Sequence, residues 1–375
     1  MTASVKNEQK QGPVVVERVS SIDFFRGLTM FLLIGESTRL YSCLLNFDNG
    51  SVHFMATQLS HHEWHGLHFW DLIQPFFMFI VGVAIPFSVH NRKKRGDSDG
   101  KLLKHAVKRS LILLALGLIV YNIASDRIVF RLQNVLAQLS VTYIVAFLIQ
   151  RKNFSFQVAF TVVILLLTDL AYRLFPVEGF NHPWEAFHNL GTWVNMKIEG
   201  SEQTSIWASL NAIPTIAHTV WGVLCGKLLI SKKSTAQKIK IMIMAGVACL
   251  AAGYFLDLSG ITPIIKKIAT SSFVFVSGGW SILALCFSYC LIDVKKGFEK
   301  GAKIFIAVGM NCIFIYMVFE CGGANFLSDV FMPIFSSLLF WIGELTSKIL
   351  IGISVWAVLW YVCYWMFKKK IFIKI

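Results

Sequence analysis

Several apolar runs in this sequence are each about as long as a helix must be to cross a lipid bilayer. Residues 102–121, 158–174 and 269–292 are the clearest examples, and a helix needs about 20 apolar residues to span the hydrocarbon. The chain is 55% hydrophobic and 15% charged, against about 45–50% and about 25% in soluble domains. These runs exclude an ordinary cytosolic enzyme, a disordered chain and a secreted disulfide scaffold. They also argue against a transmembrane β-barrel, whose strands alternate in segments of about 10 residues.

The spacing of the runs predicts an all-α, polytopic integral membrane protein with about ten transmembrane helices in one bundle. The expected spans are residues 22–41, 67–90, 103–122, 134–150, 155–175, 207–230, 239–257, 269–292, 303–320 and 337–366. We expect an N-terminal segment over 1–19, a transmembrane domain over 20–366 and a basic tail over 367–375.

Basic residues gather in alternate linkers between these spans. Residues 91–109 carry eight Lys and Arg, whereas 42–66 carry none and 176–205 carry four Glu against one Lys. Because Lys and Arg collect on cytoplasmic loops, this alternation predicts that both termini are cytoplasmic. The net charge of +14 is then explained by orientation, and no nucleic-acid partner is expected.

Histidines cluster just before the second expected span. Five of the ten lie between His53 and His68. His61 and His65 have the i, i+4 spacing of a helical metal site, but the HExxH zinc motif is missed because its second His would fall at Gly66. Three interpretations stay open: a bound metal, a polar loop, and a neutral imidazole used as general base or acyl acceptor, which we favour.

Other ionisable residues interrupt the apolar runs, and such groups usually face the protein interior or a water-filled cavity. Asp71 either orients a histidine or acts as an anion at a helix start. Arg26 either pairs with Asp23 one turn away or meets an anionic ligand from the cytosol. Glu36 either pairs with Arg39 or lines a substrate cavity. Further polar groups lie near the ends of later spans: Arg131, Gln138, His218, Asn311 and Glu320.

Several stretches, in order, carry the motifs of one family. Residues 21–29 fit S-x-D-x-x-R-G, and residues 61–82 fit H-x-x-W-x-G-x-x-x-x-D-L-x-x-P-x-F-x-F-x-x-G. Residues 131–143 are similar to R-x-x-x-V-L-Q-R-L-x-V-T-Y. The chain thereby resembles, over about 20–366, the heparan-α-glucosaminide N-acetyltransferases and their bacterial relatives, some labelled as N-acetylglucosamine-related transporters. It departs from the family pattern at Glu36, where Asn is common, and at Gln138, where the family has Arg.

The resemblance implies transmembrane acetyl transfer from cytosolic acetyl-CoA to an amino sugar on the far side of a bacterial inner membrane. The W-x-G spacing places the family's active-site histidine on His61, with Trp64, Gly66 and Asp71 also matching. A thioester is already activated, so neither ATP nor a metal is required. A neutral His can deprotonate the acceptor or form an acetyl-imidazole intermediate.

We therefore expect His61 and Asp71 to be catalytic. The residues expected to bind the donor are Arg26, Lys108, Arg109 and Arg131. The residues expected to bind the acceptor are Glu36, Trp64, His65, Asn311 and Glu320. The expected partners are an amino sugar or oligosaccharide, the lipid bilayer and, as an open alternative, a second copy of the chain. The competing function is a membrane permease for N-acetylglucosamine or a similar sugar.

Overall fold

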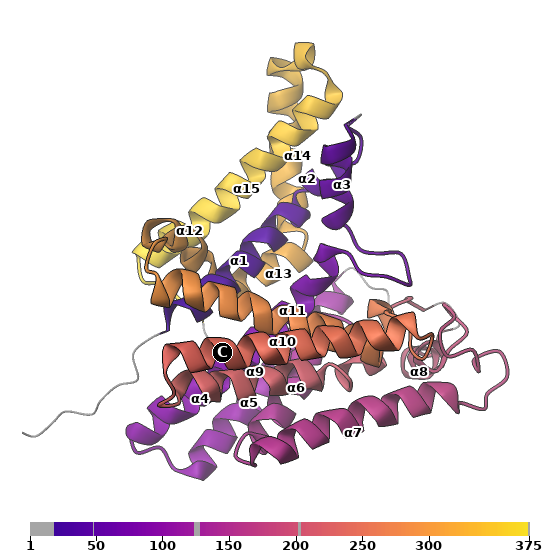
Figure 1. Cartoon of the computed structure of the whole chain (residues 1–375). Helices are drawn as coiled ribbons and strands as arrows, with labels where there is room; N and C mark the ends of the chain where they lie inside the picture. Colours follow the sequence, from indigo (N-terminus) through magenta and orange to yellow (C-terminus); the bar gives the residue numbers. More distant parts are fainter. Residues whose placement is uncertain (1–18, 48, 124–127, 202–203, 374–375) are drawn as a thin grey trace, which may run out of the picture.

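The computed structural model describes residues 19–47, 49–123, 128–201 and 204–373, and every regular element in these ranges is a helix (Figure 1). The all-α prediction is therefore confirmed. Almost all of the expected N-terminal segment lies outside the described residues. Within the described ranges, six helices are long and apolar enough to cross a membrane, or seven if one bent pair counts as a span. That is fewer than the ten expected spans.

Two helices form the centre of the bundle. Helix α4 (Ile73–Lys94) packs along α9 (Ile216–Ile230), and both are largely buried. Their axes approach closely because Gly82 and Gly222 face the partner backbone, where a Cβ would overlap a carbonyl oxygen. Small residues at such contacts are the usual means by which membrane helices pack.

The remaining long helices surround this pair. They are α1 (Ser20–Ser37), α5 (Asp99–Asn122), α6 (Val135–Ile149), α7 (Phe154–Arg173), α10 (Thr235–Leu258) and α11 (Ser271–Tyr289). Helix α5 packs on α6, and α10 packs on α11. Helices α7 and α10 are apolar yet mostly exposed at the periphery (Figure 1). Exposed apolar helices of this length suit contact with lipid hydrocarbon.

The C-terminal part differs from the expected pattern. The predicted span 303–320 is broken into α12 (Glu299–Gly309) and α13 (Cys312–Glu320), which are bent by 61° at the break. The residues that follow it, which we expected to form a linker, form helix α14 (Gly323–Leu338). The last long helix, α15, covers Glu344–Lys368. At the break, the Asn311 side chain accepts from Ile373 N at 3.0 Å and donates to Ile371 O at 3.1 Å. The break therefore anchors the C-terminal tail.

The linkers meet at two opposite ends of the bundle. Arg151 pairs with Asp99 at the start of α5, which is the end where the basic linkers lie. Beyond the far end of α5, Leu132 N donates to Ser209 Oγ at 3.2 Å. Gly66 N donates to Ile264 O at that same end, at 2.9 Å. The histidine-rich loop, helix α8 (Leu190–Glu199) and the 259–270 loop thus form one polar cap over the helices (Figure 1).

Candidate active site

His61 and Asp71 form a hydrogen-bonded pair in this cap. His61 Nδ1 lies 2.9 Å from Asp71 Oδ1. The Asp71 side chain is almost fully buried, whereas that of His61 is 38% exposed. Because an ionised carboxylate only accepts hydrogen bonds, His61 Nδ1 carries the proton and donates a hydrogen bond to Asp71. His61 Nε2 is then left with its lone pair and can accept a proton.

The backbone around the pair fixes the carboxylate. Asp71 lies in the short 3-10 turn Phe69–Leu72 that leads into α4. Its Oδ2 accepts from His68 N at 2.9 Å and from His62 N at 3.2 Å. The loop can fold back in this way because Gly66 adopts φ 142°, where a Cβ would also collide with the His62 ring. Asp71 thus holds the loop with one oxygen and orients His61 with the other.

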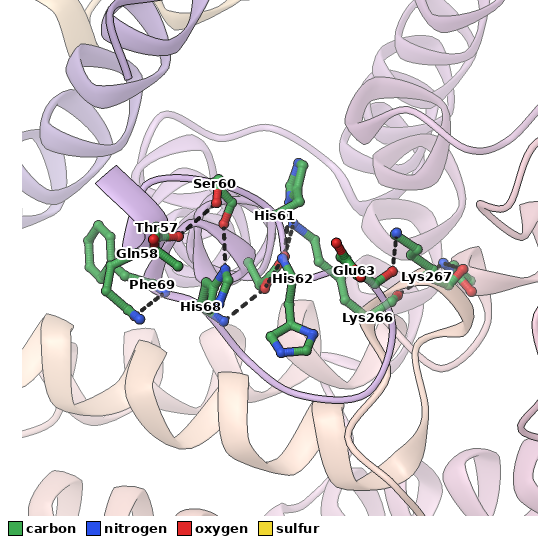
Figure 2. A network of polar contacts seen from close by, with 12 residues as sticks. Thr57, Gln58, Ser60, His61, His62, Glu63, His68, Phe69, Lys266 and Lys267 are labelled. Carbon is green, nitrogen blue, oxygen red and sulfur yellow. Dashed lines mark hydrogen bonds and ion pairs between the residues drawn. The ribbon is translucent and has the colours of Figure 1, made fainter. Parts of the chain in front are cut away.

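A third charged group, Lys266, reaches the pair from the 259–270 loop (Figure 2). Its Nζ lies 3.5 Å from Asp71 Oδ1 and 3.3 Å from His61 Nδ1. Lys266 is 7% exposed, and its Nζ also lies 5.5 Å from the centre of the Trp207 ring. Burial, partly offset by the Asp71 carboxylate, lowers the pKa of Lys266 to about 8.

These neighbours keep the imidazole neutral. Burial lowers the pKa of His61 below its ordinary 6.5, and the Lys266 charge lowers it further, against the opposing effect of Asp71. A neutral His61 at physiological pH is the form that a general base requires.

Beside His61 is a cavity of about 270 Å³ that runs in among the helices. Polar groups of its wall include Glu36 on α1, Gln74 on α4 and Glu320 on α13. The other lining residues are Met30, Leu33, Trp70, Ile73, Phe77, Tyr121, Gln133, Asn134, Val135, Trp207, Lys266, Tyr316 and Phe319, together with His61 itself. The cavity thus combines a base with carboxylates and amides, as a site for a small polar acceptor requires.

Of the predicted acceptor-binding residues, Glu36 and Glu320 line this cavity and the others lie elsewhere. Trp64 Nε1 donates to Trp184 O at 2.7 Å. His65 Nε2 pairs with Asp257 Oδ1 at 2.8 Å on the surface. Asn311 holds the C-terminal tail, as described above. The structure gives these three residues contacts that support the fold.

The predicted donor-binding cations do not line the cavity either. Arg26 pairs with Asp23 at 2.7 Å, and Arg131 pairs with the buried Glu199 at 2.7 Å. Arg109 lies 4.7 Å from the centre of the Tyr143 ring, and Lys108 is exposed on α5. Arg131 is nonetheless near the cavity, because Gln133 of its wall also bonds to Glu199, at 3.1 Å.

Lys266 and Trp207, which lie next to His61, are among the site residues that sequence reasoning missed. A usable signal existed for the lysine: Lys266 and Lys267 interrupt a linker that the alternation assigns to the non-basic side. Trp207 lies at the expected start of a span, where aromatic residues are common, so it offered no such signal. Within the described residues, no group of three or more His, Cys, Asp or Glu side chains is arranged to hold a metal ion.

The family model and the curated relatives that match this chain carry the same name. A family model described as "heparan-alpha-glucosaminide N-acetyltransferase, catalytic" matches residues 18–253, which include His61 and Asp71. The curated protein of that name from Homo sapiens is 24% identical over 366 residues, covering 81% of this chain and 53% of the relative. The Mus musculus protein is 25% identical over 367 residues with the same coverage. The chain therefore spans about half the length of the curated relatives it matches.

Proposed function

Because the chain belongs to the heparan-α-glucosaminide N-acetyltransferase family, we propose that it is a membrane acetyltransferase that uses acetyl-CoA as donor. The acceptor is the amino group of an amino sugar or a related glycan. The observation that supports this most directly is the His61–Asp71 pair at the wall of a cavity among membrane-type helices.

The proposed chemistry uses the free nitrogen of His61. The sugar amine attacks the thioester carbonyl while His61 Nε2 takes its proton, and Asp71 stabilises the imidazolium that results. The carbon–sulfur bond then breaks, and the CoA thiolate recovers the proton from His61. General-base assistance of this kind contributes about 10²–10⁴ in rate, so positioning in the cavity supplies most of the remainder.

The donor reaches the cavity from the end of the bundle opposite His61. Met30, in the cavity wall, lies one helical turn beyond Arg26 on α1. Arg26 and Arg109 each have a buried Nε–H with no hydrogen-bond partner among the described residues. Such cations suit the phosphates of CoA, and α5, which carries Arg109, begins within the basic stretch 91–109.

The proposed setting is a bacterial inner membrane crossed ten times, with both termini cytoplasmic and His61 near the outer face. The ten spans comprise the six apolar helices, the bent pair α12–α13, the less apolar helices α1 and α5, and α6, which is apolar but only 15 residues long. Helix α14 then belongs to the linker between the last two spans. Alternation of basic and non-basic linkers between opposite ends supports this arrangement. Homodimer formation stays a prediction.

Acetyl transfer can be measured with labelled acetyl-CoA and glucosamine in proteoliposomes. We expect transfer by the wild type, and a loss of at least about 10² in turnover for His61→Ala with acetyl-CoA binding retained. His65→Ala is the matched control, because its imidazole is also paired with a carboxylate but lies outside the cavity. Near-normal transfer by His61→Ala would refute the assignment, and sugar flux without acetylation would indicate the permease.

A further inference from the structure

Lys266 is held in place by the backbone on either side of it. Asn211 Nδ2 donates to Lys267 O at 3.0 Å, and Ala208 N donates to the same oxygen at 2.9 Å. On the preceding side, Ile265 N donates to Thr270 Oγ1 at 3.0 Å. The lysine therefore extends from an anchored loop into the cavity, where it is a lining residue.

The Lys266 ammonium has more donors than the surrounding protein has acceptors. It carries three N–H groups and no acceptor. Its polar neighbours within 3.5 Å in the described chain are Asp71 Oδ1 and His61 Nδ1, and the Glu36 carboxylate of the cavity wall acts on its charge from farther away. His61 Nδ1 cannot accept a hydrogen bond from Lys266, because that nitrogen carries a proton and already donates a hydrogen bond to Asp71. One carboxylate oxygen at 3.5 Å therefore serves three donors, although a buried charge is stable only when it is paired and hydrogen-bonded.

The unused donors and the base are close together. Lys266 Nζ lies 3.3 Å from His61 Nδ1, on the same ring whose Nε2 would receive the proton of the acceptor, and both side chains line the cavity. A carbonyl under attack by a nucleophile that His61 deprotonates must lie within a few ångströms of that ring. Its oxygen acquires negative charge, and a donor already in position can stabilise that charge without reorganising.

We propose that Lys266 is a catalytic residue that donates a hydrogen bond to the thioester carbonyl oxygen and stabilises its negative charge in the tetrahedral intermediate. This inference rests on the acetyl transfer proposed above. The amine nitrogen forms its bond to the carbonyl carbon, and the carbonyl electron pair moves to the oxygen facing Lys266. Collapse of the intermediate restores the carbonyl and expels the CoA thiolate. Lys266 keeps its proton throughout, and His61 carries the proton from the amine to the thiolate.

The position also affects the base. The Lys266 charge opposes protonation of His61, so the same ammonium stabilises the oxyanion and keeps the base neutral. Lys266 therefore has a signature that a residue supporting only the fold would not share. Its removal should lower turnover and also move the acidic limb of the pH–rate profile.

The experiment compares Lys266→Met, which keeps the length and burial of the side chain, with Lys266→Arg and Lys267→Met. Lys267 is the matched control because it follows directly in the chain, bonds to the Glu63 carbonyl and does not line the cavity. We expect Lys266→Met to lower kcat about 10²–10³-fold with the KM of each substrate within about threefold of wild type. The acidic limb of its kcat/KM profile should move to higher pH. Lys266→Arg should recover part of the rate. Lys267→Met should keep the wild-type kcat, with a smaller shift of the acidic limb, because the Lys267 charge acts more weakly on His61.

Three outcomes would overturn the proposal for Lys266. One is a kcat for Lys266→Met within threefold of wild type. Another is a loss confined to KM. The third is a loss of turnover that is fully explained by a smaller fraction of folded protein, measured by thermal unfolding of each variant, while the pH profile stays unchanged. In all three, the wild type still transfers acetyl groups, whereas a wild type without transfer would refute the proposed function itself.

Discussion

Replacing Asp71 with Asn should disable the base while leaving the loop folded. Asp71 Oδ2 accepts two backbone N–H groups, from His62 and His68. In the Asn variant the single amide oxygen must take that position, because an NH₂ group there would face two donors. The NH₂ group then occupies the place of Oδ1, opposite His61 Nδ1 and Lys266 Nζ. Two donors would then face each other unless the His61 proton moves from Nδ1 to Nε2. A protonated Nε2 can no longer accept the proton of the acceptor.

Two losses combine in the expected magnitude. The charge-assisted hydrogen bond between His61 and Asp71, at 2.9 Å, stabilises the developing imidazolium by about 1.5–3 kcal/mol. That corresponds to a rate factor of about 10–10², and the reversed tautomer adds a further loss. We expect turnover to fall by about 10²–10⁴, with acetyl-CoA affinity little changed.

The assay is acetyl transfer by proteoliposomes, with the folded fraction of each variant measured by thermal unfolding. Asp97→Asn is the matched control, because the same substitution there removes the charge that pairs with Arg92 and Lys101 at the other end of the bundle. Turnover of folded Asp71→Asn within threefold of wild type would refute the argument that Asp71 sets the His61 tautomer.

Further predictions follow from the same geometry. Because burial and Lys266 lower the pKa of His61 below 6.5, and the base works when neutral, kcat/KM divided by the neutral fraction of the acceptor amine should stay level down to about pH 6.5 and fall only below it; a corrected profile that begins to fall above pH 7 would contradict this. Loss of the Lys266 proton, with its pKa of about 8, should give a second fall above that pH. Arg26→Gln should weaken acetyl-CoA binding about tenfold by calorimetry, whereas unchanged affinity would leave Arg26 as the structural partner of Asp23. In a cysteine-free background, an impermeant thiol reagent should label Glu185→Cys but not Ser98→Cys in intact cells, and the reverse pattern would invert the topology.

The His61–Asp71 pair could be predicted because its two members are close in sequence. His61 and Asp71 are only ten positions apart, and a short loop before a helix brings such residues together whatever the rest of the chain does. The W-x-G spacing then selected His61 from five clustered histidines. His65 also pairs with a carboxylate, but its partner is a residue 192 positions away. No local pattern contains that pairing.

The same reasoning could not predict that Lys266 lies in the site. It is 205 positions from His61, and its loop is brought to the site by the packing of α10 and α11 against the central helices. The charge pattern indicated that a lysine is unusual on this side of the bundle, but this applied equally to Lys266 and Lys267. Only the fold shows that one ammonium enters the cavity while its neighbour bonds to the Glu63 carbonyl outside it.

The shortfall from ten expected spans to six clearly apolar ones has a related cause. A helix must be apolar where lipid surrounds it, as α7 and α10 are. A helix enclosed by protein can carry polar groups instead, provided that they face a cavity or one another. The cavity walls contain Glu36 from α1 and Glu320 from α13, neither of which lies in one of the six apolar helices. Glu36 therefore both lowers the apolarity of α1 and makes the cavity polar enough to hold an acceptor, whereas α6 is apolar but short and the α12–α13 pair is apolar but bent.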